Sequence, residues 1–149
     1  MRVVLQRVRE AAVTVRGQYI NSIGKGLLLL VGIGRGDSVK TVRAMAQKIS
    51  KLRVFEDKDG KMNLDVIQAV GKILSVPQFT LLGDTSKGNR PGFDGAAFPE
   101  DAVVLWEEFN KSLKGKKILV KEGEFGAHME IRLVNDGPVT FILDSKREE

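Results

Sequence analysis

The chain offers few side chains suited to acid–base or nucleophilic chemistry, and the best candidates lie in one short segment. Gln78, Phe79 and Thr80 follow an apolar run and precede a loop rich in Gly, Asn and Pro. Sites are often built where strands end in loops. Thr80 is a weak nucleophile without a base, and no base is evident in the sequence. Gln78 and the backbone N–H groups of Phe79 and Thr80 could instead donate hydrogen bonds to a developing oxyanion.

A second unusual feature is the pair Gly137-Pro138, which interrupts an apolar C-terminal run. Pro cannot donate to a sheet and Gly gives up side-chain packing, so the pair weakens a strand. Asp136-Gly137 is also a common hairpin-turn signal that Pro would sharpen. However, X-Pro bonds become cis at modest cost, and a buried Gly-Pro could then present two carbonyls in one direction. The residues alone leave both interpretations open.

Several standard enzyme sites are missing from the sequence. The chain has no Cys, which excludes a thiolate nucleophile, a disulfide framework and a Cys-based zinc site. His128 is the only histidine and lies on the polar side of its strand, so we expect an ordinary exposed residue and no metal site. Gly32 to Asp37 has only part of a dinucleotide-loop pattern and follows hairpins, so no such cofactor is expected. Four aromatic residues could either stack on a base or belong to the core: Phe79, Phe93, Phe98 and Phe125.

The bulk properties are those of a globular protein of ordinary composition. The chain has 149 residues, about the size of one domain, with 42% hydrophobic and 29% charged residues. No window approaches the roughly 18 apolar residues of a membrane span, and the start is too charged for a signal peptide. We therefore expect a cytoplasmic protein. The net charge of +5 suits a polyanionic partner, and the densest basic cluster is Lys111, Lys114, Lys116, Lys117 and Lys121, with Lys87 and Arg90 in a separate loop.

Hydrophobic periodicity predicts strands in the first third of the chain. Residues 2–34 are typical of two β-hairpins, with a turn at Gly17-Gln18. Leu27 to Val31 is apolar at every position and should be a central strand covered on both faces. A helix capped by Asp37 or Ser38 should follow, with an apolar stripe of Val42, Met45, Ala46, Ile49 and Leu52, and then a short strand over 52–55.

The remaining pattern predicts further strands and a second helix. Strands are expected over 70–76, 129–133 and 139–143, and a helix should begin at Pro99 with the inward stripe Ala102, Leu105, Trp106, Phe109 and Leu113. The predicted fold class is α+β, with antiparallel or mixed, barrel-like sheets and two helices packed outside. We expect one domain over 1–145 and a charged tail over 146–149.

Two segments together resemble the signature motifs of the D-aminoacyl-tRNA deacylases. They are Gln78-Phe79-Thr80-Leu81 and Asn135-Asp136-Gly137-Pro138-Val139-Thr140, and the similarity extends over nearly the whole chain. Further landmarks are Gln6-Arg7-Val8, Lys87-Gly88-Asn89-Arg90-Pro91 and Gly123-Glu124-Phe125-Gly126-Ala127. One departure is Pro77, where the family's first motif usually begins with Ser.

The resemblance implies a homodimer that hydrolyses the ester between a D-amino acid and the 3′-terminal adenosine of tRNA, or glycine mischarged on tRNA(Ala). It further implies that Gly137-Pro138 is cis and enters the partner subunit's pocket. There its carbonyls would face the α-carbon of the substrate and meet an L side chain, so selection would work by steric rejection. No cofactor, metal or membrane is implied.

The resemblance also assigns roles to individual residues. Arg7 matches the arginine that holds the Gly-Pro loop, and Phe125, Met129 and Ala102 match positions that border the pocket. Gln78, Phe79 and Thr80 would position the ester and stabilise the oxyanion, while the terminal ribose 2′-hydroxyl replaces a protein base. A nucleophilic Thr80 is an alternative mechanism. A non-catalytic tRNA-binding module and a structural dimer are alternative functions, but the intact Gln78-Phe79-Thr80 favours an enzyme.

Overall fold

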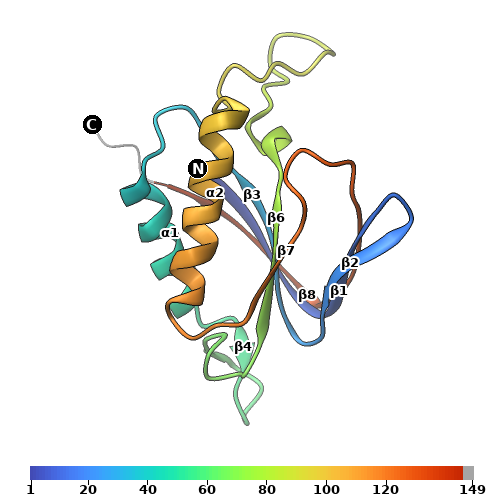
Figure 1. The fold of residues 1–149 in the computed structure, drawn as a ribbon. Coiled ribbons are helices and arrows are strands. Elements are labelled where there is room, and N and C mark those ends of the chain that lie inside the picture. Colours follow the sequence, from blue (N-terminus) through green and yellow to red (C-terminus); the bar gives the residue numbers. More distant parts are fainter. Residues whose placement is uncertain (146–149) are drawn as a thin grey trace.

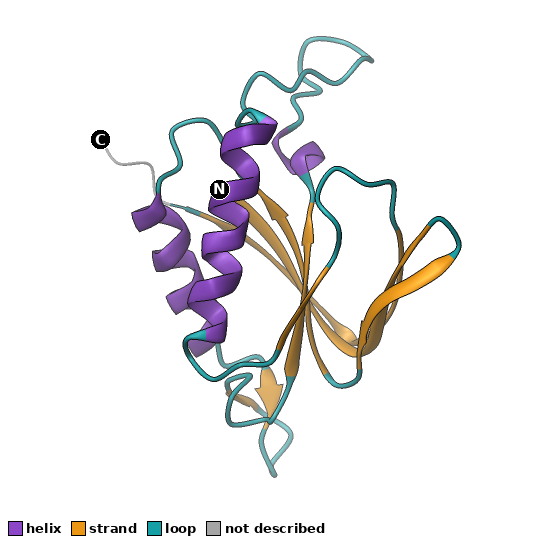
Figure 2. Ribbon diagram, viewed as in Figure 1, coloured by secondary structure: helices purple, strands orange, loops and turns teal. Residues whose placement is uncertain are grey.

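The structure is a computed structural model, and it describes residues 1–145. Two helices lie side by side on one face of a strongly twisted sheet (Figures 1 and 2). In chain order the elements are β1 (Arg2–Val15), β2 (Gln18–Ile23), β3 (Gly26–Gly32), α1 (Val39–Lys51), β4 (Phe55–Glu56), β5 (Met62–Leu64), β6 (Lys72–Pro77), the 3₁₀ helix η1 (Phe79–Leu82), α2 (Pro99–Lys114), β7 (Val120–Glu122) and β8 (Glu130–Asp144).

Strand β1 is the shared partner of three other strands. Its second half pairs with β2 through a two-residue turn at Arg16-Gly17, where both residues have positive φ. Its first half pairs with β3, from Arg2↔Gly32 to Val8↔Gly26, and β8 pairs along its other edge. The prediction of two consecutive hairpins was therefore wrong in its second half. Because β1 is long enough to pair with both strands end to end, β3 pairs with β1 and not with β2.

The second part of the sheet is parallel. Strand β3 pairs with β6, and β6 pairs with β7, both in parallel register. A parallel pair needs a crossover connection, and α1 and α2 provide the two crossovers on the same face. The predicted α+β class with a mixed sheet and two outer helices is confirmed.

The run from Leu27 to Val31 lies between two apolar cores. Leu27, Leu29 and Val31 pack in the core beneath the helices. Leu28 belongs to a second core inside the curl of the sheet, with Leu30 packed against it. The sheet curls because β2 and β7, at opposite ends of the strand order, come together: the Asn21 side-chain amide donates to the Glu122 carbonyl at 2.6 Å. The predicted barrel-like form and two-sided burial are both confirmed.

The helix caps follow from local chemistry. Ser38 caps α1, and its hydroxyl accepts from the Thr41 N–H. Asp37, the other candidate cap, instead accepts from the Gly34 N–H at 2.6 Å and pairs with the α-ammonium of Met1 at 2.7 Å. Pro99 begins α2 as predicted. The predicted apolar positions of both helices are buried, except Leu52 and Leu105, which are partly buried. The polar residue Asn110 of α2 is also buried, which the sequence pattern did not predict.

Four predicted strands differ from the structure. The expected strand over 52–55 is only Phe55–Glu56, paired with β5. The strand expected from Val70 begins at Lys72, since Val70 has φ +54° and ends a turn. The two strands expected over 129–133 and 139–143 are one strand, β8.

The two ends of the described chain lie together. The Ser145 N–H donates to the Met1 carbonyl at 2.9 Å, and its hydroxyl accepts from the Met1 ammonium. The tail predicted over 146–149 lies outside the described residues. No helix in the described part of the chain is long and apolar enough to span a membrane.

Candidate active site

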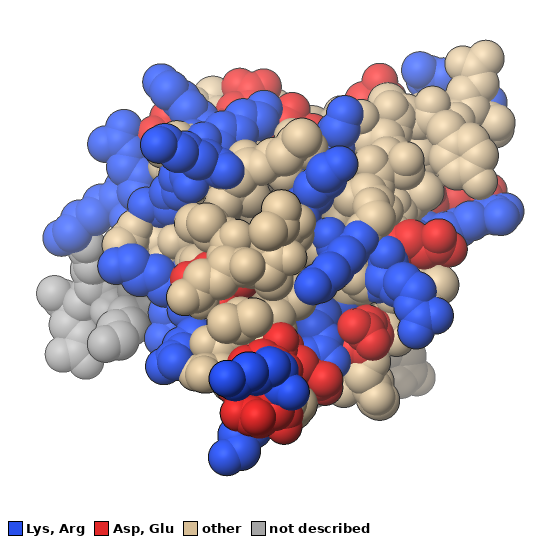
Figure 3. All heavy atoms as spheres, turned by 90° about the horizontal axis from the view of Figure 1, so that it is seen from below, with Lys and Arg blue, Asp and Glu red and all other residues tan. Residues whose placement is uncertain are grey.

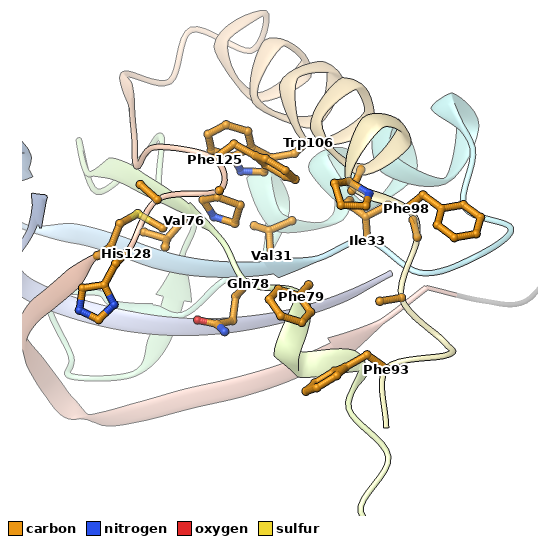
Figure 4. Close-up of a pocket in the computed structure, with 18 of the residues that line it drawn as sticks. Val31, Ile33, Val76, Gln78, Phe79, Phe93, Phe98, Trp106, Phe125 and His128 are labelled. Atoms are coloured by element: carbon orange, nitrogen blue, oxygen red, sulfur yellow. The ribbon is translucent and has the colours of Figure 1, made fainter. Parts of the chain in front are cut away.

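A pocket of about 550 Å³ opens where β3 and β6 end, beside the start of α2. Val31 and Val76 line it from the strands, Ile33 lines it just beyond β3, and Trp106 lines it from α2 (Figure 4). Other lining residues come from the segment that leads into β8, among them Phe125 and Met129. The pocket is thus apolar inside, with a small number of polar groups at its mouth, as in many small-ligand sites.

Gln78 and Phe79 line the mouth of this pocket, where β6 passes into η1, and Thr80 follows them in η1. The Gln78 N–H donates to the Val31 carbonyl at 2.8 Å, which keeps β6 joined to β3 up to the turn. The Gln78 side-chain amide donates to the Thr80 hydroxyl. The first N–H groups of a helix have no intrahelical acceptor, and no side chain caps η1. The Phe79 and Thr80 N–H groups are therefore positioned as donors at the end of the strand.

The phenylalanines surround the mouth of the pocket. Phe79 is 58% exposed, and its ring meets that of Phe93 edge to face with 5.1 Å between centroids. Phe98 is 57% exposed and lies under the Arg35 guanidinium, 5.0 Å from the ring centroid. Of the two interpretations that the sequence left open, a core role is wrong for these three rings. Of the four rings that the sequence left open, Phe125 is the one that packs against the core beneath the helices.

The buried floor includes one polar contact. The Trp106 indole N–H donates to the Ser75 hydroxyl at 3.0 Å, and both residues are almost fully buried. The Trp106 and Phe125 rings lie 6.0 Å apart. This contact fixes the orientation of the indole beneath the pocket, because the buried N–H has found its acceptor.

The pocket-bordering residues suggested by the resemblance meet here. Ala102, Phe125 and Met129 all line the pocket, and the Met129 sulfur accepts from the Glu124 N–H at 3.4 Å. His128 is exposed, as expected, and lies at the rim (Figure 4). Sequence reasoning missed Arg35 as a rim residue, and its only signal was a position just after a buried strand.

Gly137 and Pro138 form part of a bulge in β8. Gln6 pairs with Thr140 and Val8 pairs with Asn135, so residues 136–139 lie opposite the single residue Arg7. The Gly137-Pro138 peptide bond is cis, and both residues are exposed. The pair is therefore neither a simple hairpin corner nor the end of a strand, because β8 continues on both sides.

Arg7 holds this bulge from behind. Its guanidinium is buried, and Nε donates to the Asp136 carbonyl at 2.9 Å while Nη1 donates to the Val54 carbonyl at 2.8 Å. The Asp136 and Glu56 carboxylates lie 3.7 and 3.8 Å from the same guanidinium. A buried guanidinium needs such acceptors, so one side chain of β1 ties the bulge to the segment at β4.

Asn135 closes the base of the bulge. Its side-chain oxygen accepts from the Val139 N–H at 2.7 Å, and its NH₂ group donates to the Val139 carbonyl at 3.2 Å and the Thr140 hydroxyl at 3.0 Å. Gly137 has φ +151°, and a Cβ there would lie 2.6 Å from a Val139 methyl. The sequence contained Asn135 in its motif, but the side chain's role as a clasp was missed. The preference of Asn for local backbone hydrogen bonds was the available signal.

The bulge and the pocket lie apart within one chain. Arg7 pairs with Leu27 near the start of β3, whereas Val31 lines the pocket near its end. Leu27 and Val31 are four residues apart, which corresponds to about 13 Å along the strand. The predicted site residues therefore form two groups, and Gly137 and Pro138 do not line the pocket of their own chain.

Comparisons with known proteins agree on the class of protein. The family model described as D-Tyr-tRNA(Tyr) deacylase matches residues 4–144. The D-aminoacyl-tRNA deacylase of Brevibacillus brevis is 55% identical, covering 97% of this chain and all of the relative, and that of a Geobacillus species is 52% identical, covering 99% and 97%. The chain belongs to the D-Tyr-tRNA(Tyr) deacylase family.

Two solved structures share the fold. One, titled c-Myc DNA unwinding element binding protein, is 42% identical with a TM-score of 0.92, covering 99% of this chain and 100% of the other. The second is titled as a probable eukaryotic D-amino acid tRNA deacylase, with a TM-score of 0.81 over 95% and 97% of the two chains. It is 17% identical, so it supports the fold alone.

Replacing Asn135 by Ala should loosen the bulge, because the Val139 N–H and carbonyl lose their side-chain partners. We expect the free energy of unfolding to fall by about 1–2 kcal/mol, measured by denaturant titration. Asn135→Asp keeps the acceptor oxygen and should lose less. Asn89→Ala, in an exposed loop, is the matched control and should change stability by less than about 0.5 kcal/mol. Equal stabilities for the Asn135→Ala and Asn89→Ala variants would show that the clasp contributes nothing.

Proposed function

We propose that the protein hydrolyses the ester bond of D-aminoacyl-tRNA and releases the free D-amino acid. The observation that carries this proposal is the placement of Gln78 and Phe79 at the mouth of an apolar pocket, with Thr80 next in η1, in a chain of this family. The pocket volume of about 550 Å³ suits an aminoacyl group with its adenosine. The curated relatives are named D-aminoacyl-tRNA deacylases, which supports the same substrate class.

The proposed reaction relies on positioning and on backbone donors. Water attacks the ester carbonyl, and the N–H groups of Phe79 and Thr80 stabilise the negative charge that develops on its oxygen. The bond between the carbonyl carbon and the ribose 3′-oxygen then breaks, and the 3′-oxygen takes up the proton that the attacking water gives up. The terminal 2′-hydroxyl of the substrate assists in place of a protein base. The Gln78 amide holds the Thr80 hydroxyl, which supports a positioning role for Thr80.

Selection of the D-configuration is assigned to the bulge in β8. Arg7 and Asn135 hold Asp136 and Val139, which flank the exposed Gly137 and Pro138, so the carbonyls of the pair would form a stiff edge. With this edge against the α-carbon, an L side chain would clash, whereas a D side chain would point away and glycine would have none. The same geometry would admit glycine mischarged on tRNA(Ala).

A second copy of the chain would bring the bulge to the pocket. Within one chain, the strand positions beside the bulge and the pocket are about 13 Å apart along β3, and Gly137 and Pro138 do not line their own pocket, which favours a role for the bulge at a second copy. In the described chain β8 pairs only with β1, which leaves its outer edge open for association. Val134, Phe141 and Ile142 are exposed apolar residues of the same strand. These features support a homodimer in which each subunit completes the other's site.

Nucleic-acid binding without hydrolysis is the second candidate function. It is favoured by the relative whose title names a DNA unwinding element binding protein. That candidate gives no role to the backbone donors of η1 or to the apolar pocket. Ester release separates the two functions directly.

The proposed activity should appear as release of D-tyrosine from D-Tyr-tRNA. We expect D-Tyr-tRNA to be cleaved at least about 100-fold faster than L-Tyr-tRNA, because the L side chain meets the Gly137-Pro138 carbonyls. Gly-tRNA(Ala) should be cleaved as well. Gel-resolved aminoacyl-tRNA with labelled amino acid measures all three. Binding of tRNA with no release of D-tyrosine or glycine would support the second candidate instead.

Removing the Thr80 hydroxyl tests its role in the reaction. If the backbone N–H groups carry the chemistry, Thr80→Ala should keep kcat within roughly tenfold of the wild type. A nucleophilic hydroxyl would instead lose on the order of 10⁴-fold or more. Single-turnover deacylation of D-Tyr-tRNA distinguishes these values, and Thr85→Ala in the following loop provides the control.

A charge on β8 should separate the subunits and disable the site. Ile142 is 67% exposed, and Ile142→Glu should give a monomer by sedimentation velocity. Discrimination between D- and L-Tyr-tRNA should fall together with the dimer, because the partner's Gly-Pro pair is removed. Val104→Glu, on an exposed position of α2, should remain a dimer with full discrimination. A monomeric Ile142→Glu with unchanged discrimination would contradict the assembly of the site across subunits.

A further inference from the structure

A short hairpin loop stands beside the mouth of the pocket. Asp84 and Gly92 exchange two backbone hydrogen bonds, of 2.7 and 2.8 Å, which close residues 85–91 into a loop. The Asp84 carboxylate accepts from the hydroxyl and backbone N–H of Ser86, and these bonds hold the pKa of Asp84 below its usual value. Phe93 follows the loop directly and lines the pocket. The loop is therefore anchored at the mouth and extends away from it (Figure 1).

This loop and the rim carry cations that no acidic side chain neutralises. Lys87 and Arg90 are exposed in the loop, and Arg35 lies on the pocket rim over Phe98. Within the part of the chain that the structure describes, none of the three forms an ion pair. The two acidic residues of the same segment are Asp84, whose carboxylate is engaged by Ser86, and Asp94. Arg35 thus lies on the rim of the pocket, and Lys87 and Arg90 lie in the loop that is anchored beside it.

The part of the proposed substrate that would pass this rim is the negatively charged tRNA strand. If the aminoacyl ester occupies the pocket, the rest of the tRNA leaves through the mouth as a phosphodiester strand with one negative charge per nucleotide. We propose that Arg35, Lys87 and Arg90 form a cationic rim that binds the phosphates of the 3′-terminal single strand of tRNA. The proposal rests on the proposed function and adds the surface that holds the substrate outside the pocket.

The lysines at the other end of α2 are less suited to this role. Pro99 and Trp106 line the pocket, whereas Lys114 and Lys116 lie at the end of a 16-residue helix that is about 24 Å long. Lys114 also pairs with Glu122 at 3.1 Å, and Lys116 donates to Gln47. The end of the molecule seen in Figure 3 mixes basic with acidic side chains. The first phosphates outside the pocket therefore meet the rim and not this cluster.

The test compares a substrate with phosphates to one without. In a Lys87→Gln/Arg90→Gln variant, KM for D-Tyr-tRNA should rise roughly tenfold with kcat unchanged, and the slope of log(kcat/KM) against log salt should fall by about 1.4, at about 0.7 per lost contact. Cleavage of 2′(3′)-O-D-tyrosyl-adenosine, which has no phosphate, should stay at the wild-type rate. Lys48→Gln/Lys111→Gln removes the same charge from the two long helices and should behave as wild type.

Each outcome has a definite meaning. An unchanged KM and salt slope for the Lys87→Gln/Arg90→Gln variant would overturn the proposal, as would an equal loss in Lys48→Gln/Lys111→Gln. An equal loss with both substrates would make the loop part of the pocket, and would also overturn it. Lys87→Arg/Arg90→Lys keeps the charge and should restore KM. If the wild type cleaves neither substrate, the proposed function itself fails, which is a separate result.

Discussion

The constraint on which this fold depends is the need to bury both faces of β3. Every residue from Leu27 to Val31 is apolar, so one sheet face covered by helices would leave Leu28 and Leu30 in water. The sheet resolves this by curling until β2 and β7 meet, and it encloses a second core. The same curl brings the segment before β8 over the ends of β3 and β6. The pocket is thus a consequence of how a central strand is covered.

The elements with strong periodicity could be predicted from sequence, and pairing between distant strands could not. The stripes of α1 and α2, the cap at Ser38 and the start at Pro99 all depend on neighbours within a few residues. The partner of β3 depends on the length of β1 and on closure of the whole sheet, which no local pattern contains. Likewise, Val139 was predicted to begin a new strand after Gly137-Pro138, whereas it is the last residue of a four-residue bulge that lies opposite one distant residue, Arg7.

The candidate site shows the same division. Gln78, Phe79, Ala102, Phe125 and Met129 were named from motifs and do meet at one pocket. The clasp of Asn135 and the pairing of Arg35 with Phe98 depend on side-chain geometry that spacing does not encode. What the structure adds is a spatial separation: Gln78 and Phe79 lie where β3 and β6 end, and Gly137-Pro138 lies opposite Arg7, near the start of β3. In the proposed function both groups act through backbone atoms, so the side-chain types alone say little about them.

The placement of Trp106 has an optical consequence. It is the only tryptophan of the chain, and its indole is fixed by Ser75 in the floor of the pocket, near Phe125. Any fluorescence excited at the red edge of the protein spectrum therefore originates at one point of the molecule. A ligand that fills the cavity changes the polarity and quenching around that indole, so the protein carries an intrinsic emission signal for occupancy of its own pocket.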